Sequence, residues 1–422
     1  MKKFLFIFIS FLGLYSCDNF TEQQFEQQKT PAPVITRSVD INMTEGDACM
    51  QWHANCLGNL IINTLRTRDG RKAFPDCFGG LYTDSTGQLT VLVKGNLNEG
   101  KNAICKICND NSIDYKQCLY SYQELSEIMS EITKKLPTLP LELRTNICSY
   151  YLSDSENVVY VGLLHKNERV LSQFKKMVLD HDAIRFFESE MRWHDKDLKT
   201  MVVPVWLKPG GMLSSAFHEN FDVYNGSWAF RAREISDTSS CGMVTAAHVV
   251  KDSVFTHFFY GVPYSVMTDN VDAAFVTRSN PNVHLTFIPS NTLSTEFHGG
   301  SYPSYTQEVE LDTALYSPIA GTTINKRGWT TGLTTGQVTS TNFCTSFIGY
   351  DGLLQVINNM TLATFVCDHG DSGGIVYTYF SNQNKRYTTG IVTGSIKVNG
   401  VITGGFYTKA SLALSTLGLE RY

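Results

Sequence analysis

The stretch that decides the fold is Cys367-Asp368-His369-Gly370-Asp371-Ser372-Gly373-Gly374, which lies between two apolar runs, 362–366 and 375–379. Glycine tolerates backbone conformations that other residues resist, so glycines on both sides of Ser372 allow a tight turn. In such a turn two backbone N–H groups can converge beside the serine hydroxyl, which suits a nucleophilic serine and its oxyanion hole. An ordinary hairpin turn would also use these residues, so the interpretation depends on partners elsewhere in the chain.

The composition bounds the classes of protein to which the chain can belong. A length of 422 residues with 42% hydrophobic residues is enough for two packed domains and a leader. The net charge is −5 and the basic residues form no cluster, so we expect no nucleic-acid partner.

The N-terminus reads as a targeting segment. Residues 1–3 carry two lysines, 4–15 form an apolar run too short to span a bilayer, and Cys17 follows. We predict a signal peptide over 1–17 that resembles a bacterial lipoprotein signal, with Cys17 as the lipidated residue. Simple secretion is the alternative, because Tyr15 is bulky for that motif. Both place the mature chain outside the cytoplasm, and residues 18–47 read as a flexible linker.

The cysteine count agrees with an oxidising compartment. The chain has 11 cysteines, and setting Cys17 aside leaves an even number for disulfides. Cys105 and Cys108 form a CxxC pair followed by Cys118, which could indicate zinc or redox chemistry. A second CxxC pair and a histidine at ligand spacing are missing, so we predict disulfides and no metal site.

The two halves of the chain differ in their predicted secondary structure. Residues 48–195 mix helical and strand patterns and predict an α+β domain. Its expected elements are a helix within 47–65, a hairpin over 78–93, a helix over 122–136, a strand over 157–164 and a helix over 170–179. From about residue 200 to 422, short strands alternate with turn residues and one helix is expected over 410–419. This pattern predicts an all-β barrel or sandwich.

Two further residues in the second half give Ser372 possible partners. His248 ends Thr245-Ala246-Ala247-His248 after a β-rich run, and Asp272 opens an apolar strand. A lone histidine on an apolar segment is usually a core residue, but a buried carboxylate such as Asp272 needs a partner. Serine needs a base, and that base needs a carboxylate that holds its tautomer. The order His248, Asp272, Ser372 is the order found in chymotrypsin.

With these motifs the region 200–422 resembles a chymotrypsin-like serine peptidase of the bacterial streptogrisin and alpha-lytic protease branch. The resemblance rests on six segments, namely 226–232, 245–248, 328–332 (Gly-Trp-Thr-Thr-Gly), 370–374, 390–395 and 404–407. It implies two six-stranded antiparallel β-barrels, trypsin-like, preceded by a smaller α+β domain. It also implies an exported serine endopeptidase that acts on protein or peptide substrates through an acyl-enzyme intermediate, without a cofactor and as a monomer.

The resemblance assigns roles to the residues of the turn and its partners. Ser372 would be the nucleophile, His248 the general base and acid, and Asp272 the residue that orients His248. The N–H groups of Gly370 and Ser372 would form the oxyanion hole.

The residue before the serine has a different expected role. In the family its carboxylate is buried against a cation, which in the bacterial branch precedes the Gly-x-Thr-Thr-Gly segment. Asp371 should therefore pair with Lys326, with Arg327 as the neighbouring alternative. The family's usual cysteines are missing at Val249 and Thr335, so we predict a disulfide between Cys344 and Cys367.

The substrate strand is expected at Val392, Thr393, Gly394 and Ser395. Val392 stands where glutamate-specific relatives have a histidine, so a preference for glutamate is disfavoured. Ser395 replaces a glycine that often keeps the pocket open. We therefore expect a small or medium apolar side chain before the cleaved bond.

The first half resembles the pro-regions of streptogrisin-type enzymes. The hairpin over 78–93 and the strand and helix over 158–176 carry this resemblance, which implies an inhibitory and folding pro-domain that is cut near 191–210. A permanent accessory domain is the alternative, because seven cysteines are unusual for a pro-domain. For the whole chain, the alternative function is a catalytically silent surface lipoprotein that uses the protease fold as a binding module.

Overall fold

The computed structural model describes residues 45–65, 74–108, 110–192, 206–216, 223–250, 261–268, 270–277, 288–297, 300–301, 309–348 and 354–422. The chain divides into a unit of Met1–Asn42 and a compact unit of Met43–Tyr422. The predicted signal segment, Cys17 and nearly all of the predicted linker lie outside the described residues. In the parts of the chain that the structure describes, no helix is long and apolar enough to cross a membrane.

The chain begins with a lobe built on a three-stranded sheet, which we call the N-lobe. Strands β1 and β2 pair antiparallel, and β3 joins β2 in parallel. The Asp84 carboxylate accepts the N–H groups of Thr86 at 2.9 Å and Gln88 at 3.0 Å, which closes the hairpin predicted over 78–93. The elements are η1 (Cys49–Gln51), α1 (Trp52–Thr64), β1 (Phe78–Thr83), β2 (Leu89–Lys94), α2 (Leu97–Cys105) and β3 (Asp114–Cys118).

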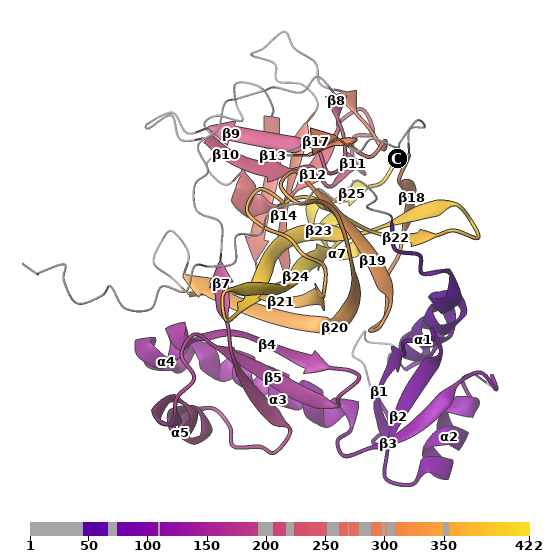
Figure 1. Ribbon diagram of the computed structural model, residues 1–422, viewed down its shortest axis with the longest axis vertical. Helices are drawn as coiled ribbons and strands as arrows, with labels where there is room; N and C mark the ends of the chain where they lie inside the picture. Colours follow the sequence, from indigo (N-terminus) through magenta and orange to yellow (C-terminus); the bar gives the residue numbers. More distant parts are fainter. Residues whose placement is uncertain are drawn as a thin grey trace, which may run out of the picture. The chain divides into compact units, whose positions relative to one another are not determined.

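A second lobe, the C-lobe, follows. Its helix α3 starts at a capping box in which Ser121 and Glu124 bond each other's backbone N–H, and its apolar stripe faces the sheet. Helices α3 and α5 cover the strands β4 and β5 (Figure 1), as the predicted helices and strand require. The elements are α3 (Tyr122–Lys135), η2 (Leu136–Thr138), α4 (Leu141–Asn146), β4 (Ile147–Ser153), β5 (Val158–Leu163), α5 (Glu168–Met177), β6 (Ile184–Glu188) and β7 (Glu190–Arg192).

The second half of the chain is nearly all β, as its turn-rich sequence predicts. Its first sheet has the order β13-β14-β12-β11-β25 and packs on a core around Trp228, Phe230 and Phe275. The elements before residue 310 are β8 (Trp206–Leu207), β9 (Met212–Ala216), β10 (Val223–Ser227), β11 (Phe230–Glu234), β12 (Cys241–Thr245), η3 (Ala247–Val249), β13 (Gly261–Thr268), β14 (Val271–Thr277), β15 (Ile288–Pro289), β16 (Glu296–Phe297) and β17 (Gly300–Ser301).

The following strands close into an antiparallel ring. The order is β19-β22-β23-β24-β21-β20, and β20 pairs back to β19. This ring has the six strands expected of one barrel, whereas six strands for the other barrel stay a prediction. The elements are β18 (Asp312–Leu315), β19 (Thr323–Gly328), β20 (Gly332–Ile348), β21 (Leu354–Ala363), β22 (Ile375–Phe380), β23 (Lys385–Val398), β24 (Val401–Lys409), α7 (Ala410–Leu417) and β25 (Leu419–Glu420).

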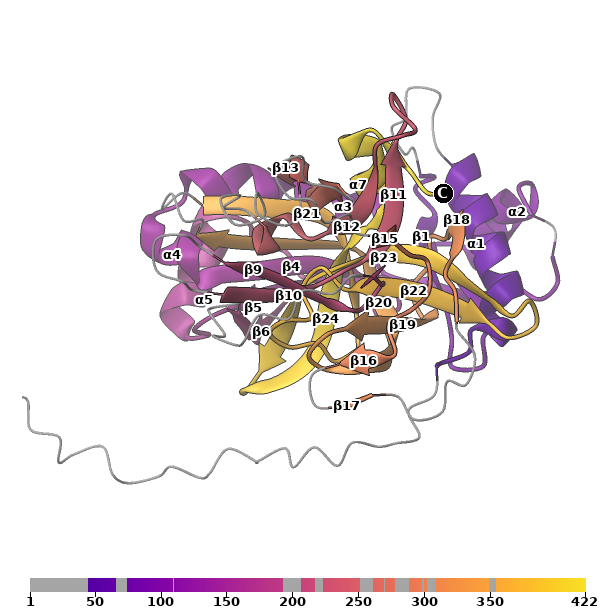
Figure 2. The same ribbon diagram turned by 90° about the horizontal axis from the view of Figure 1, so that it is seen from above.

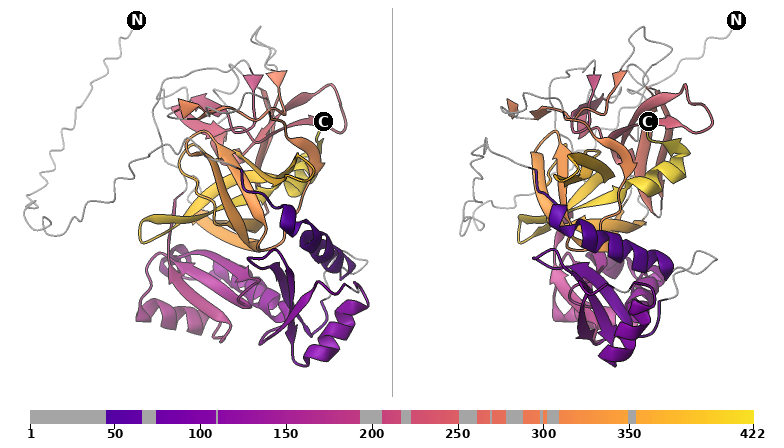
Figure 3. Two further views of the ribbon diagram at one scale, coloured as in Figure 1. Left: turned by 45° about the vertical axis from the view of Figure 1, so that its right-hand side comes forward. Right: turned by 90° about the vertical axis from the view of Figure 1, so that its right-hand side faces the viewer.

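The sheet of the ring continues into the C-lobe. Strand β20 pairs with β4 through Phe343–Tyr151, Cys344–Tyr150 and Thr345–Ser149, and the two strands can be followed side by side in Figures 1 and 2. Helix α1 of the N-lobe also lies against the ring region (Figure 3), since Asn55 bonds Thr322. The two halves of the chain are therefore joined by a shared sheet and by helix packing.

Gly321 shows how closely the halves approach. Its φ of +84° is left-handed, and a Cβ built there would lie 1.9 Å from the Thr83 carbonyl oxygen. Gly400 has a similar φ of +76° but open space around it.

We predict that Gly400→Ala lowers the free energy of unfolding by about 1–2 kcal/mol, the cost of a left-handed alanine. Gly321→Ala should lower the free energy of unfolding by clearly more than Gly400→Ala does, because Thr83 must also move.

Urea denaturation of the two full-length variants measures this difference. An equal fall in the free energy of unfolding for the two variants would mean that the contact with Thr83 adds nothing to the cost at residue 321.

Candidate active site

The glycine-rich turn between β21 and β22 carries Ser372. Gly370 and Gly373 have φ of +88° and +81°, the left-handed conformation that glycine adopts without steric cost. A Cβ on Gly373 would lie 2.1 Å from Thr245 Oγ1 and 2.4 Å from the Ser227 carbonyl oxygen. The turn is therefore packed against the end of β12, and only glycine fits at 373.

The end of β12 also positions His248. Strands β12 and β14 pair antiparallel, which brings the start of β14 next to the short helix η3 that holds His248. His248 Nδ1 lies 2.6 Å from Asp272 Oδ2, and the His248 backbone N–H donates to Asp272 Oδ1 at 3.1 Å. Asp272 is fully buried, and its own N–H donates to the Thr408 hydroxyl at 3.2 Å. The carboxylate thus fixes both the ring and the backbone of His248.

Ser372 is held close to the segment that carries His248. The Ser372 carbonyl accepts the Ser227 N–H at 2.8 Å. A Cβ on Gly226 would lie 2.3 Å from a methyl group of Val249 and 3.1 Å from the Ser372 carbonyl oxygen. The Ser372 hydroxyl itself donates to the Thr393 carbonyl at 3.4 Å. The structure thus brings His248 onto Asp272, and it brings the residue after His248 next to Ser372.

The turn contains the two backbone N–H groups, of Gly370 and Ser372, that the resemblance predicts as oxyanion-hole donors. The carbonyl of the peptide before Gly370 accepts the Thr330 hydroxyl, and the carbonyl of the peptide before Ser372 accepts the Gly374 N–H at 2.8 Å. In a trans peptide the N–H points opposite to the carbonyl, so both N–H groups face away from these partners. Within the described ranges, neither N–H group has an acceptor. They are free to bind a developing oxyanion.

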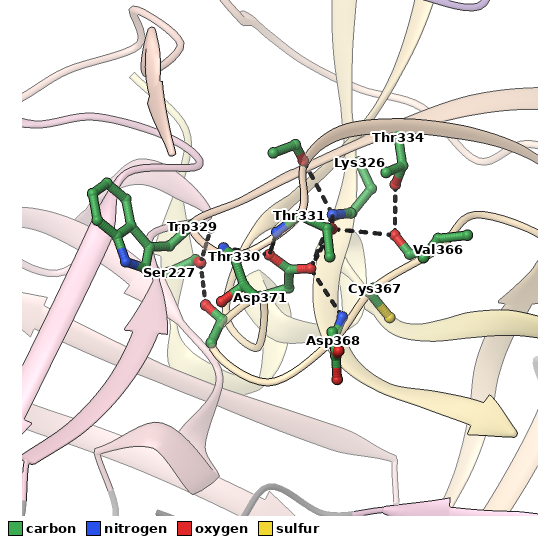
Figure 4. A network of polar contacts seen from close by, with 12 residues as sticks. Ser227, Lys326, Trp329, Thr330, Thr331, Thr334, Val366, Cys367, Asp368 and Asp371 are labelled. Atoms are coloured by element: carbon green, nitrogen blue, oxygen red, sulfur yellow. Dashed lines mark hydrogen bonds and ion pairs between the residues drawn. The ribbon is translucent and has the colours of Figure 1, made fainter. Parts of the chain in front are cut away.

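A buried carboxylate fixes the turn from behind (Figure 4). Asp371 Oδ1 accepts the N–H groups of Thr330 at 2.8 Å and Thr331 at 2.9 Å. Asp371 Oδ2 accepts the Asp368 N–H at 3.0 Å and lies 3.1 Å from Lys326 Nζ. Both Asp371 and Lys326 are fully buried, so each charge needs the other. The structure brings together the predicted pair.

Three hydroxyl residues that the sequence did not single out support this arrangement. Ser227 is fully buried, donates to the Gly370 carbonyl at 2.7 Å and accepts the Trp329 N–H at 2.8 Å. Thr330 and Thr331 add their hydroxyls around Asp371 and the turn (Figure 4). Ser227 and the Thr-Thr pair lie in the segments 226–232 and 328–332 that carry the resemblance, but no role was predicted for their hydroxyl groups.

The predicted substrate strand lies beside the turn. Val392, Thr393, Gly394 and Ser395 belong to β23, and Val392 exchanges two backbone hydrogen bonds with Gly373 and Gly374 at 2.8 and 2.9 Å. A Cβ on Gly394 would lie 2.6 Å from the Phe406 ring, and one on Gly405 would lie 2.2 Å from the Phe365 ring. Aromatic rings therefore fill the space behind this strand.

The structure does not bring together the predicted disulfide. Cys344 lies in the core of the C-lobe beside Tyr150, whereas Cys367 lies in the core of the ring and donates to the Gly394 carbonyl at 3.3 Å. All cysteines of the described residues are free thiols, including those of the N-lobe. Burial raises the pKa of the Cys344 thiol to about 12 and raises that of Cys367 as well, so both stay protonated. The prediction of a Cys344–Cys367 bond is corrected, because the two residues occupy separate cores.

Two further predictions concern a metal site and lipidation. The described residues hold no group of three or more histidine, cysteine, aspartate or glutamate side chains that could bind a metal ion. Cys17, the predicted lipidation site, lies outside the described residues.

Comparisons with known proteins place the first half of the chain. Residues 39–118 match the family of Pro-like N-terminal domains, and residues 123–189 match that of Pro-like C-terminal domains. We call residues 39–192, which contain both matches, the pro-region. Among solved structures, Thermobifida fusca protease A is 19% identical with a TM-score of 0.37, over 51% of this chain and 98% of that protease. Nocardiopsis protease is 22% identical with a TM-score of 0.37, over 51% and 98%. None of the curated proteins compared with the chain matches it.

The pro-region reaches the site through its last strand. Strand β7 pairs antiparallel with β23, with Arg192 opposite Ser395, Met191 opposite Ile396 and Glu190 opposite Lys397. Two of the four predicted substrate-strand residues, Thr393 and Gly394, directly precede this pairing along β23. The pro-region chain runs in the direction of Thr393, whose carbonyl accepts the Ser372 hydroxyl.

The Lys326–Asp371 pair gives a test of the turn. We predict that Lys326→Met lowers the free energy of unfolding by about 3–5 kcal/mol, because it leaves a carboxylate buried without its cation. Lys385 pairs with Asp312 at 3.0 Å but is half exposed, so Lys385→Met should cost about 1 kcal/mol or less. Denaturant unfolding of both variants decides the matter, and a small loss for Lys326→Met would show that Asp371 is held without the ion pair.

Proposed function

We propose that the chain is the zymogen of an exported serine endopeptidase that hydrolyses peptide bonds. The observation that carries this proposal is the contact of His248 with Asp272 beside a turn whose two free N–H groups flank Ser372. A structural histidine would need neither a buried carboxylate on its ring and backbone nor a neighbouring serine.

Acylation would begin at Ser372. Its hydroxyl oxygen attacks the substrate carbonyl carbon, and the proton passes to Nε2 of His248. The carbonyl oxygen becomes an oxyanion that accepts hydrogen bonds from the N–H groups of Gly370 and Ser372. Asp272 bonds Nδ1, keeps the ring in the tautomer that accepts the proton at Nε2, and stabilises the imidazolium that forms.

The intermediate then collapses. The bond between the carbonyl carbon and the amide nitrogen breaks, and His248 gives its proton to the leaving amine. Water attacks the resulting ester by the same route and releases Ser372. Every charge in this sequence is carried by groups of the protein or substrate, so no cofactor is needed.

The pro-region would inhibit by covering the substrate strand. Peptide substrates add to an exposed strand edge through main-chain hydrogen bonds. Strand β7 already holds the edge of β23 at residues 395–397, so a substrate must displace it. We propose that processing falls within the predicted range 191–210, part of which lies outside the described residues. Full peptidase activity in a chain that keeps residues 48–190 attached would contradict this.

Specificity and localisation extend the proposal. The rings of Phe365 and Phe406 that crowd Gly405 and Gly394 support a small or medium apolar side chain before the cleaved bond. The signal segment supports export, with lipidation at Cys17 or simple secretion as the two forms. Protein or peptide substrates outside the cytoplasm would be the partners.

A serine-directed reagent tests the enzyme. We predict that a fluorophosphonate probe labels the processed wild-type protein and does not label Ser372→Ala, because only an activated serine reacts. Labelling is read by mass spectrometry of the peptide that contains residue 372. A processed wild-type protein without label would favour the silent lipoprotein instead.

Ser227 gives a second test, since its hydroxyl holds the Gly370 carbonyl. We predict that Ser227→Ala lowers kcat about 10- to 100-fold with KM nearly unchanged, because the 370–371 peptide, which lies between the two oxyanion-donating peptides, loses its fixed orientation. Ser340→Ala is the matched control, because Ser340 is fully buried and accepts the Asn342 N–H at 3.1 Å in β20. Steady-state kinetics with one peptide substrate compare the two variants. An equal fall in kcat in both would show that Ser227 has only a structural role.

A further inference from the structure

Residues 45–59, which we call the latch segment, form an interface with the second half of the chain that the site does not use. The segment contains the first described residues and most of helix α1. It contacts β19, β22, the start of β23 and the connection 316–323. Of the predicted linker 18–47, residues 45–47 are therefore held rather than free.

The latch segment begins with a buried acidic anchor. The Glu45 side chain is 4% exposed, and its carboxylate accepts two hydrogen bonds from Arg386 Nε at 2.7 and 2.9 Å. Arg386 Nη2 lies 2.7 Å from the same carboxylate, and the Tyr377 hydroxyl donates to it at 2.8 Å. Arg327 Nη2 lies 3.9 Å away. A buried charge is tolerated only with such partners, so this pocket is built for a carboxylate.

The next residues add to the ring as an extended chain. Gly46 and Asn325 exchange two hydrogen bonds at 2.7 and 2.9 Å. Asp47 forms a parallel bridge with Tyr379, and the Ala48 N–H donates to the Tyr379 carbonyl at 3.0 Å. A Cβ on Gly46 would lie 2.3 Å from a threonine methyl group, so the pocket accepts only glycine at this position.

Helix α1 then presents a polar ladder. Three amide side chains spaced four residues apart, one at the N-cap of α1 and two within it, each bond the segment 316–323. The bonds join Gln51 to Gly321 (2.9 Å) and Thr323 (2.7 Å), Asn55 to Ile319 (3.1 Å) and Thr322 (2.9 Å), and Asn59 to Ser317 (3.1 Å). Asn55 is fully buried. Between these amides, Trp52 packs on Tyr316, Phe380 and Tyr387, with ring centroids 4.8–6.4 Å apart.

We propose that the protease half carries an exosite for an acidic segment followed by an aromatic helix, and that the latch segment occupies it. The latch segment would hold the pro-region on the protease after the chain is cut near 191–210. This inference rests on the proposed function, because it concerns what happens after processing. Its partner is the chain's own residues 45–59.

The exosite is separate from the substrate strand. The latch bonds reach residues 316–327 and 377–387, whereas β7 pairs with 395–397. Arg327 and Lys326 are neighbours on β19, so their side chains point to opposite faces. Lys326 faces Asp371 and Arg327 faces Glu45. A substrate that displaces β7 would therefore leave the latch segment bound.

The test uses the full chain in the inactive Ser372→Ala background. A recognition site for an added sequence-specific protease is placed between β7 and β8, so the cut does not depend on the chain's own activity. After the cut, native mass spectrometry follows dissociation of the pro-region fragment. We predict that the fragment stays bound, and that Glu45→Gln raises its dissociation rate about 100-fold or more, since the buried arginines lose their counter-charge. Trp52→Leu, which keeps an apolar side chain, should raise it less.

The matched control is Glu142→Gln, which removes an exposed carboxylate that pairs with Arg169 at 3.2 Å in the same pro-region. Its fragment should dissociate like that of the parent. Equal dissociation of Glu45→Gln and Glu142→Gln would overturn the proposal. If Glu45→Gln does not fold, unchanged dissociation of Trp52→Leu would overturn it.

Hydrogen exchange separates the attachment of the latch segment from that of β7. With excess uncleaved peptide substrate, the Ala48 amide should stay protected while amides of β7 exchange. Loss of protection at both would show a single attachment, whereas failure of the proposed function would appear only in the labelling of Ser372.

Discussion

The structure depends on one buried ion pair, Lys326 with Asp371. The carboxylate of Asp371 gathers three backbone N–H groups and an ammonium group, and the turn that holds Ser372 is folded around it. Because Lys326 lies on β19 within the same chain, the pair does not wait for a new N-terminus. The turn that holds Ser372 is therefore already formed in the chain that includes the pro-region.

This constraint bears on the proposed inhibition. With the turn already formed, the pro-region would not need to change the conformation around Ser372, and under the proposed function it would act through the surfaces that it covers. Its three attachments use different chemistry. Strand β4 extends the ring through β20, β7 covers the edge of β23, and the latch segment places Glu45 between arginines. Under the proposed function, the strand edge for the substrate is covered by β7, whereas the latch segment binds a different surface.

The sequence predicted the local features best. The helix over 122–136, the hairpin over 78–93 and the motifs that contain His248, Asp272 and Lys326 are all encoded in short segments. Pairing between distant strands was not predictable. The alternation of apolar and polar residues along β4 and β20 determines which face of each strand is buried, but not which strand it pairs with. Cysteine spacing likewise does not give connectivity, and Cys344 and Cys367 proved to lie in separate cores. Gln51, Asn55 and Asn59 look like ordinary surface residues until their partners near residue 320 are known.

We infer that the turn that holds Ser372 is complete before the proposed cut. Hydrogen–deuterium exchange of the Asp368, Thr330 and Thr331 amides tests it directly, because all three donate to Asp371. The account predicts equal protection of these amides in the uncut Ser372→Ala chain and in the processed protein. Amides that exchange freely in the uncut chain and become protected only after processing would contradict it.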